Sequence, residues 1–254
     1  MIVYFSGTGN SRWCADLLAD HLQDETLDSF GYIRNGIAAD LISGKPWVFV
    51  CPTYAWKIPR IFEQFIRSGN FMGEQEAYFV LTCGAGVGGA GAFLEELCQS
   101  VGLRYMGILE VVLPENYIAM FPVPDETKSR KIFEKARPVL LEGVYHIKQK
   151  QPFPGKKPSA VGRLQSKLIN DVFYSRFIKA DPFTVSDKCI GSGKCVDACV
   201  LATSRCKTAS RSGDRTVPTV WPASAAALSR PSNTAVCPKA SAAIRHRVIN
   251  NSYK

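Results

Sequence analysis

Short apolar runs alternate with amphipathic segments along the first 150 residues. Four runs are rich in Val, Ile, Phe or Tyr and apolar on both faces, as strands of a sheet covered on both sides must be; they span residues 2–5, 47–51, 77–82 and 108–113. Helical periodicity follows each of them, at residues 12–23, 59–68, 92–101 and 126–150. A further short strand is expected within residues 26–33. This alternation predicts an α/β fold, in which a parallel sheet has helices on both faces and binds ligands beyond the carboxyl ends of its strands.

The pattern changes after residue 150. Residues 151–163 are rich in Pro, Gly and Lys, which is typical of a linker. Residues 164–178 have the periodicity of a short amphipathic helix, and residues 180–186 lead into a cysteine cluster. We therefore divide the chain into a domain at residues 1–150, a linker and helix at 151–180, a cysteine-bearing segment at 181–200 and a tail at 201–254.

A hydroxyl-rich glycine loop lies between the first predicted strand and the first predicted helix. Its residues are Ser6, Gly7, Thr8, Gly9, Asn10 and Ser11. Glycines let backbone N–H groups converge on an anion, and a helix amino terminus attracts a phosphate without a basic side chain. The loop contains no Lys, which argues against a nucleoside triphosphate site, and its glycine spacing does not match the dinucleotide fingerprint. The alternative interpretation is an ordinary turn with Ser11 as the helix N-cap.

Two further loops follow the strands predicted at 47–51 and 77–82. The first offers aromatic side chains and comprises Pro52, Thr53, Tyr54, Ala55 and Trp56. The second is glycine-rich and begins with Cys83, Gly84, Ala85 and Gly86. Tyr54 and Trp56 would each fit a core position if seen alone, but both loops are expected at the same edge of the sheet as the first.

Taken together, the three loops resemble those of flavodoxins, and the resemblance covers roughly residues 1–150. It implies a flavodoxin-like doubly wound parallel sheet that binds flavin mononucleotide (FMN). It also implies that the six residues of the glycine loop, the five residues from Pro52 to Trp56, and Cys83, Gly84 and Gly86 contact the cofactor.

The nine cysteines fall into groups of different character. Four are scattered among apolar neighbours, which favours small buried hydrophobic side chains; these are Cys14, Cys51, Cys83 and Cys98. Three others crowd into eleven residues, namely Cys189, Cys195 and Cys199. In a chain that shows no secretory signal, such crowding favours metal ligation over disulfide bonds.

The segment from Asp187 to Cys199 resembles the C-x2-C-x2-C-x3-C-P run of bacterial two-cluster ferredoxins. Ser192 stands in place of the second cysteine, and Val200 in place of the proline. The order of segments then resembles a bacterial and archaeal family of flavodoxin–ferredoxin fusions. That resemblance implies a small ferredoxin-like α+β module with [4Fe–4S] clusters, for which Cys189, Cys195 and Cys199 are the remaining ligands.

The tail departs from this family pattern, because no second four-cysteine run follows. Residues 201–254 contain two cysteines, Cys206 and Cys237, together with ten Ala and eight Ser. When residues 206–235 are read one frame over with permitted codons, they acquire a C-x2-C-x2-C-x3-C-P run. We hypothesise a one-base frameshift near residues 200–203, and we expect an incomplete module, a disordered tail and impaired clusters.

Most of the net charge of +9 lies in this tail, where nine Lys or Arg and one Asp contribute +8. A scrambled tail is not a selected binding face, so no nucleic-acid partner is expected. No apolar run reaches the length of about eighteen residues that a membrane span needs, and the chain opens on a strand-like run. We therefore expect a cytoplasmic protein that does not contact a membrane.

These patterns predict an electron-transfer flavoprotein that passes electrons between FMN, [4Fe–4S] clusters and a redox partner protein. Two alternatives belong to other classes. One is a flavodoxin-like reductase of quinones or flavins that uses NAD(P)H, against which stands the lack of a second glycine-rich dinucleotide site. The other is a nucleic-acid-binding module that uses the basic tail.

Overall fold

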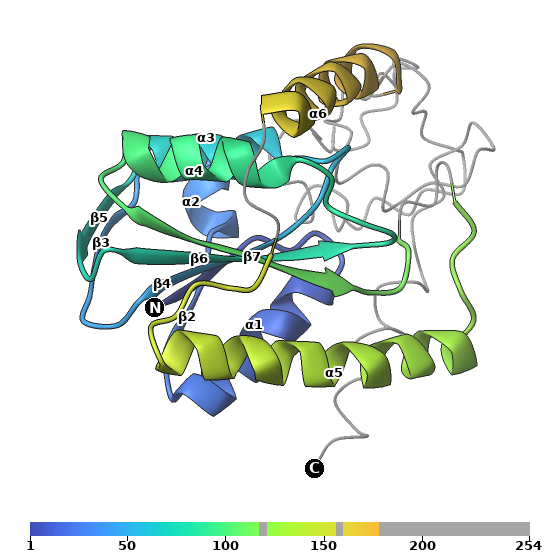
Figure 1. Ribbon diagram of the computed structural model, residues 1–254, viewed down its shortest axis with the longest axis horizontal. Helices are drawn as coiled ribbons and strands as arrows, with labels where there is room; N and C mark the ends of the chain where they lie inside the picture. The colour runs from blue at the N-terminus through green and yellow to red at the C-terminus, as the bar shows by residue number, and fades with distance from the viewer. Residues whose placement is uncertain (117–120, 156–159, 178–254) are drawn as a thin grey trace, which may run out of the picture.

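The computed structural model describes residues 1–116, 121–155 and 160–177. Within them, a parallel five-stranded sheet forms the centre of the molecule (Figure 1). Its strands are β1 Ile2–Tyr4, β2 Thr26–Asp28, β4 Trp47–Pro52, β6 Glu76–Cys83 and β7 Arg104–Val112. They lie in the order β2-β1-β4-β6-β7. Counted along the chain within this sheet, the order is 2-1-3-4-5, which is that of flavodoxin-like doubly wound folds. The predicted α/β fold class is confirmed.

Two layers of helices cover the sheet (Figure 1). Helices α1 (Asn10–Leu22) and α5 (Glu126–Lys148) pack on one face. Helices α2 (Phe30–Asn35), α3 (Arg60–Ser68) and α4 (Ala90–Ser100) pack on the other. The alternation of side chains along each strand therefore divides the apolar core into two.

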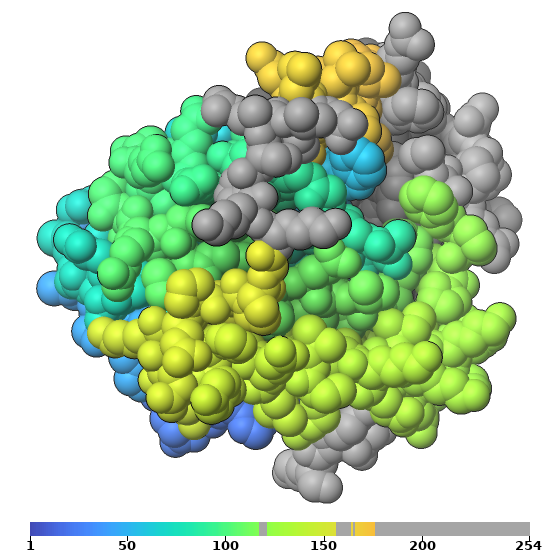
Figure 2. Space-filling model, viewed as in Figure 1, coloured from blue at the N-terminus to red at the C-terminus, as the bar shows by residue number. Residues whose placement is uncertain are grey.

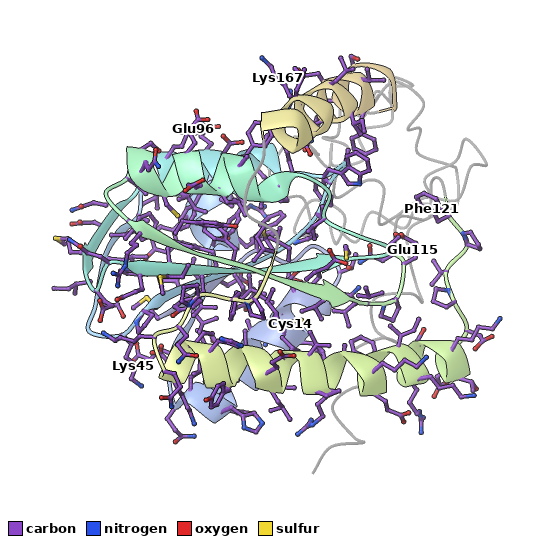
Figure 3. All side chains as sticks on the ribbon, in the orientation of Figure 1. Cys14, Lys45, Glu96, Glu115, Phe121 and Lys167 are labelled. Atoms are coloured by element: carbon purple, nitrogen blue, oxygen red, sulfur yellow. The ribbon has the colours of Figure 1, made fainter. Side chains whose placement is uncertain are left out.

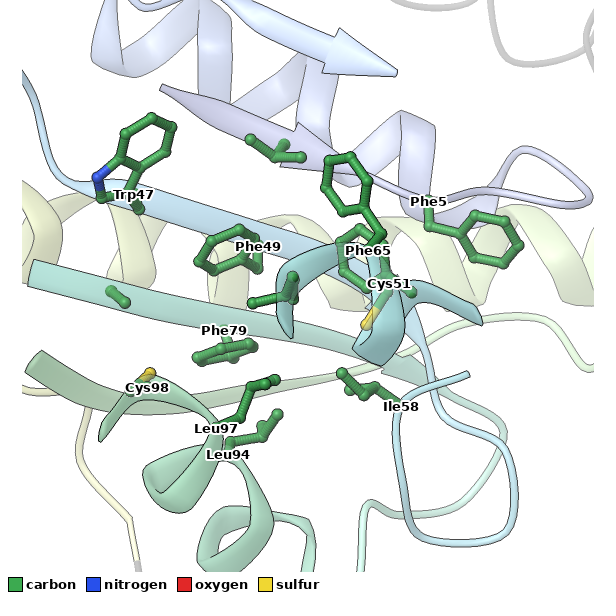
Figure 4. Close-up of a cluster of buried hydrophobic side chains, with 14 of the residues drawn as sticks. Phe5, Trp47, Phe49, Cys51, Ile58, Phe65, Phe79, Leu94, Leu97 and Cys98 are labelled. Carbon is green, nitrogen blue, oxygen red and sulfur yellow. The ribbon is translucent and has the colours of Figure 1, made fainter. Parts of the chain in front are cut away.

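Aromatic side chains dominate the core on the α3–α4 side (Figure 4). Phe49 is fully buried on β4 and stacks on Phe79 of β6, with ring centroids 5.2 Å apart. Burial of one such side chain contributes about 1.5–3 kcal/mol. Of the cysteines predicted to be small core residues, Cys14, Cys51 and Cys98 are buried, whereas Cys83 at the end of β6 is only half-buried.

Several short elements were not predicted. Helix α2 and a separate parallel pair, β3 (Asp40–Ser43) with β5 (Asn70–Gly73), have no clear periodicity. Their exposed positions outnumber their buried ones, so the apolar signal on which the prediction depended is weak.

Some predicted boundaries were wrong. Strand β7 begins at Arg104 rather than at residue 108, because a register shift opposite Ala77 and Phe79 lets it continue through Gly107 at a φ of +103°. Helix α1 begins at Asn10 rather than at residue 12, so Asn10 and Ser11 form its first turn.

The chain beyond α5 returns along the sheet. The Tyr78 hydroxyl on β6 donates to the Gln151 carbonyl over 3.1 Å, and Phe153 is buried beside Tyr78. The helix predicted at residues 164–178 corresponds to helix α6 (Ala160–Val172), which begins earlier than predicted and is followed by a π-helical turn at Phe173–Phe177. Helix α6 packs on α4 and lies on the surface of the molecule (Figure 2).

Helix α6 does not have the predicted arrangement of polar and apolar faces. Ser166 and Asn170 are 0 % and 1 % exposed, whereas Leu164 and Leu168 are 70 % and 66 % exposed. The buried polar groups are satisfied by hydrogen bonds, as described below. No helix in the described ranges has both the length and the apolar content needed to cross a membrane.

Candidate functional site

The glycine loop between β1 and α1 borders open space. A Cβ added at Gly7 or Gly9 would meet no atom within 4 Å. Gly9 has a φ of +103°, which disfavours any other residue there. Gly9 is also the N-cap of α1 and has no side chain to offer as a cap. The first-turn N–H groups of α1 and its positive dipole end are therefore suited to an anion.

Hydrogen bonds hold this loop against its neighbours. The Ser6 Oγ accepts from the Gly9 N–H over 3.1 Å, and the buried Ser11 and Thr82 hydroxyls lie 2.9 Å apart. The Asn10 side chain donates to the Pro114 carbonyl over 3.0 Å. The Asn116 side-chain amide donates to the Thr8 hydroxyl, so the loop after β7 also braces the glycine loop.

The loop after β4 contains a tight turn of unusual backbone geometry. The Tyr54 N–H donates to the Lys57 carbonyl over 2.8 Å, and the return bond is 3.3 Å. Ala55 and Trp56 between them have φ values of +47° and +63°. Residues with a Cβ pay about 1–2 kcal/mol each for this left-handed conformation. Strained turns of this kind persist where the surrounding structure enforces them, and they cluster at functional sites.

The loop after β6 lies directly against the loop after β4. Gly88 has a φ of +55°, and a Cβ placed there would come within 2.3 Å of the Trp56 indole. The Glu110 carboxylate accepts from the Val87 N–H over 3.2 Å. A Cβ at Gly84 would come within 2.2 Å of the Glu115 carboxylate. Glycine is thus needed at Gly88, where the indole fills the space and φ is positive, whereas at Gly84 a Cβ would require the Glu115 carboxylate to move.

A buried hydroxyl at this edge has no partner. Among the described residues, the Thr53 Oγ1 is one of three buried side-chain polar atoms without a hydrogen bond. The Thr53 N–H is satisfied by the Thr82 carbonyl over 2.8 Å, so the backbone is held while the hydroxyl is left over. Unsatisfied buried polar atoms are rare in native proteins, so the Thr53 hydroxyl is a candidate hydrogen-bonding group for a ligand at this edge.

Burial shifts the pKa values of two side chains in this region, Cys83 at the end of β6 and Lys57 after β4. Burial raises the pKa of the Cys83 thiol to about 12, helped by the nearby Glu110 carboxylate. The thiol therefore stays protonated at neutral pH and is not an activated nucleophile. In the loop after β4, burial lowers the pKa of Lys57, whose Nζ lies 3.5 Å from the centre of the Phe93 ring.

The predicted loop residues come together in space. Ser6–Ser11, Pro52–Trp56 and Cys83–Gly86 lie at the carboxyl ends of β1, β4 and β6, which are neighbours in the sheet. Glu115 marks this edge and Lys45 the opposite one in Figure 3. Because Cys83, Pro52, Asn10 and Ser11 belong to regular elements, the loops are shorter than predicted.

Four contributors to the site were not predicted. The loop after β7 adds Glu115 and Asn116, which lie in a segment without apolar periodicity. Helix α6 adds Ser166, which contacts the loop after β6, and Asn170, which contacts the loop after β4. A polar pair four residues apart on an amphipathic helix was the signal that could have indicated the second contribution.

The predicted metal ligands Cys189, Cys195 and Cys199 lie outside the described residues. Across the part of the chain that the structure describes, no group of three or more His, Cys, Asp or Glu side chains is arranged to hold a metal ion.

No family model and no curated protein matches this chain. Among solved structures, it is similar to the two-electron reduced flavodoxin of Megasphaera elsdenii, at 15 % identity over 54 % of this chain and 98 % of that one, with a TM-score of 0.34. It is also similar to a WrbA-like flavodoxin from Agrobacterium tumefaciens, at 15 % identity over 58 % and 96 %, with a TM-score of 0.31. A rubredoxin:oxygen oxidoreductase from Desulfovibrio gigas is matched at 16 % identity over 59 % of this chain and 36 % of that one, with a TM-score of 0.32. TM-scores at this level do not establish a common fold; the flavodoxin-like fold of this chain follows from its own strand order.

Proposed function

We propose that this protein is an electron-transfer flavoprotein that binds FMN at the carboxyl edge of its sheet. One observation carries the proposal: an uncapped helix amino terminus, an aromatic turn and a glycine-rich loop meet there, on three neighbouring strands. The residues present fit the cofactor, because the glycine loop borders open space and the Thr53 hydroxyl is buried without a partner among the described residues.

Each loop has its own part in the proposal. The residues Ser6–Ser11 hold the phosphate through backbone N–H groups and hydroxyls at the start of α1. The aromatic turn, Tyr54 to Trp56, provides the wall against the flavin ring, and the backbone after Cys83 approaches its edge. Bound FMN supplies one- and two-electron chemistry, while the protein supplies orientation and a controlled electrostatic environment.

We further propose that the intact ancestor passed electrons between FMN, [4Fe–4S] clusters and a redox partner protein. In this chain Cys189, Cys195 and Cys199 are too few ligands for two clusters, so cluster transfer is impaired. After anaerobic purification, the iron and acid-labile sulfide contents per chain are expected to be lower than two [4Fe–4S] clusters require. Two full clusters per chain would contradict this. A single intact reading frame through residue 254, in independent clones and close relatives, would instead contradict the frameshift near residues 200–203.

Flavin titration tests the main proposal. The flavin-free full chain is titrated with FMN and with riboflavin, which lacks the phosphate, and flavin fluorescence is followed. We expect FMN to bind at least about tenfold more tightly, since the helix amino terminus favours the dianion. Binding of neither flavin would refute the proposed function.

A charge substitution locates the phosphate. Gly7→Asp places a carboxylate at the loop, at a position where a Cβ meets no atom within 4 Å. FMN affinity should therefore fall by at least about tenfold while riboflavin affinity stays within about twofold. Gly44→Asp is the matched control, because Gly44 is equally open but precedes β4, at the opposite edge of the sheet. Equal losses of FMN affinity in both variants would place the phosphate elsewhere.

A further inference from the structure

Helix α6 buries two polar side chains at the proposed flavin site. Ser166 is 0 % exposed and Asn170 is 1 % exposed, while leucines of the same helix face solvent. A helix that packed only for hydrophobic stability would have the opposite arrangement. The reason for the inversion lies in what the two polar side chains contact.

Asn170 is bonded on both sides of its amide. Its Nδ2 donates to the Tyr54 carbonyl over 2.9 Å and to the Ala55 carbonyl over 3.5 Å. Its Oδ1 accepts from the Arg60 guanidinium over 3.2 Å, and Arg60 also pairs with Asp171 at 2.9 Å. Carbonyls only accept and a guanidinium only donates, so these partners fix the orientation of the amide.

Ser166 contacts the other loop. Its Oγ accepts from the Gly89 N–H over 3.0 Å, and Gly89 is the N-cap residue of α4. Ser166 and Asn170 lie four residues apart and so share one face of α6. One helix face therefore holds the loop after β4 and the loop after β6 at the same time.

The turn that Asn170 holds is the strained one. Ala55 and Trp56 lie in the left-handed region, and the Asn170 amide binds the carbonyls of Tyr54 and Ala55 at its start. The Trp56 indole lies against Gly88. The next residue, Gly89, donates its N–H to the Ser166 hydroxyl. Without α6, this turn would lose the side-chain hydrogen bonds that oppose its relaxation.

We propose that Asn170 and Ser166 are positioning residues for the flavin ring, so that α6 forms part of the flavin site rather than a linker to it. This inference rests on the proposed function. In this proposal, helix α6 controls the conformation of Tyr54–Lys57. That conformation in turn affects the affinity for the flavin and the reduction potential of the bound flavin.

Three variants of the full chain separate the contacts. Asn170→Asp keeps the size of the side chain and the acceptor for Arg60 but cannot donate to the carbonyls when ionised. Asn170→Ala removes both contacts, and Leu168→Ala is the control on the exposed face of the same helix. In the flavin-free protein, amide hydrogen exchange at Tyr54 and Lys57 should speed up roughly tenfold in both Asn170 variants and stay unchanged in the control.

Measurements on the bound flavin test whether the hydrogen bonds of Asn170 affect the cofactor. We expect both Asn170 variants to bind FMN about three- to tenfold more weakly and to shift the reduction potential of the bound flavin. Ala55→Gly supplies the rescue test, because glycine adopts positive φ without strain. Adding Asn170→Ala to Ala55→Gly should then change FMN affinity less than about twofold relative to Ala55→Gly alone.

The outcomes are distinct. If the unaltered chain binds no FMN, the proposed function fails. If that chain binds FMN but the Asn170 variants match it in affinity and potential, or leave exchange at Tyr54 and Lys57 unchanged, the positioning role is overturned. A loss of affinity that Ala55→Gly does not rescue would also overturn it, since the role depends on the strained turn.

Discussion

At the scale of single residues, the site loops combine closely packed glycines with the buried Thr53 hydroxyl, which has no hydrogen-bond partner among the described residues. Gly84 and Gly88 lie where a Cβ would collide with Glu115 and Trp56. Gly7 in contrast faces open space. The difference separates Gly88, which is closely packed against another protein group, from Gly7, which borders open space in the proposed phosphate loop.

Thr53 provides a prediction at this scale. Thr53→Val replaces a buried hydroxyl that has no partner among the described residues with a methyl group of similar size. We expect the flavin-free protein to become more stable, by about 1 kcal/mol, because an unsatisfied polar atom is removed. FMN affinity should fall several-fold if the cofactor completes this hydroxyl. Urea unfolding with and without FMN measures both effects, and a destabilised flavin-free variant would contradict the prediction.

At the scale of elements, side-chain hydrogen bonds align the ends of helices and strands that build the site. The Ser11 and Thr82 hydroxyls join the first turn of α1 to the end of β6 over 2.9 Å, and both are buried. Asn10 and Asn116 add links from the glycine loop to the chain after β7. Helix α6 completes the set by bonding to the loops after β4 and β6.

The Ser11–Thr82 pair can be tested by a double-mutant cycle. Ser11→Ala leaves the Thr82 hydroxyl buried without this partner, so unfolding free energy should fall by about 1–3 kcal/mol. Adding Thr82→Val removes the orphaned group, and the double variant should lose less than the sum of the single losses. Denaturant unfolding of the four proteins gives the coupling energy. Strict additivity would show that the two hydroxyls do not interact.

At the scale of the whole molecule, burial of ionisable side chains in both core layers couples the fold to alkaline pH. Burial raises the pKa of Cys98 to about 12 and that of Cys51 well above its usual value. Burial likewise raises the pKa values of Tyr4 and Tyr78 to about 12. In each case the native state disfavours the anion, so the neutral form contributes to stability.

This coupling predicts alkaline destabilisation. Stability from Cys98 is fully present below its unfolded pKa of 9.0 and is lost as pH rises toward the folded value of about 12. Between these limits each such group steepens the decline by about 1.4 kcal/mol per pH unit. Urea unfolding from pH 7 to 11 should show a fall that begins near pH 9. Cys98→Ala should decline less steeply, and equal slopes would contradict this assignment.

The sequence alone determined the main sheet and its working edge. The mostly apolar runs within Trp47–Pro52 and Glu76–Cys83 are recognisable because a strand covered on both faces carries mainly apolar side chains. The glycine loop was recognisable because its residues are neighbours along the chain. Parallel strands then bring successive loops to one edge, whatever the details of packing.

Only the tertiary structure decided which distant groups complete that edge. Asn170 lies 116 residues from Tyr54 and Asn116 lies 108 residues from Thr8, so no local pattern couples them. The direction in which α6 faces was likewise set by its hydrogen bonds to the loops rather than by its leucines. Local periodicity reports the average burial of a helix face, whereas specific polar contacts depend on where remote backbone groups come to lie.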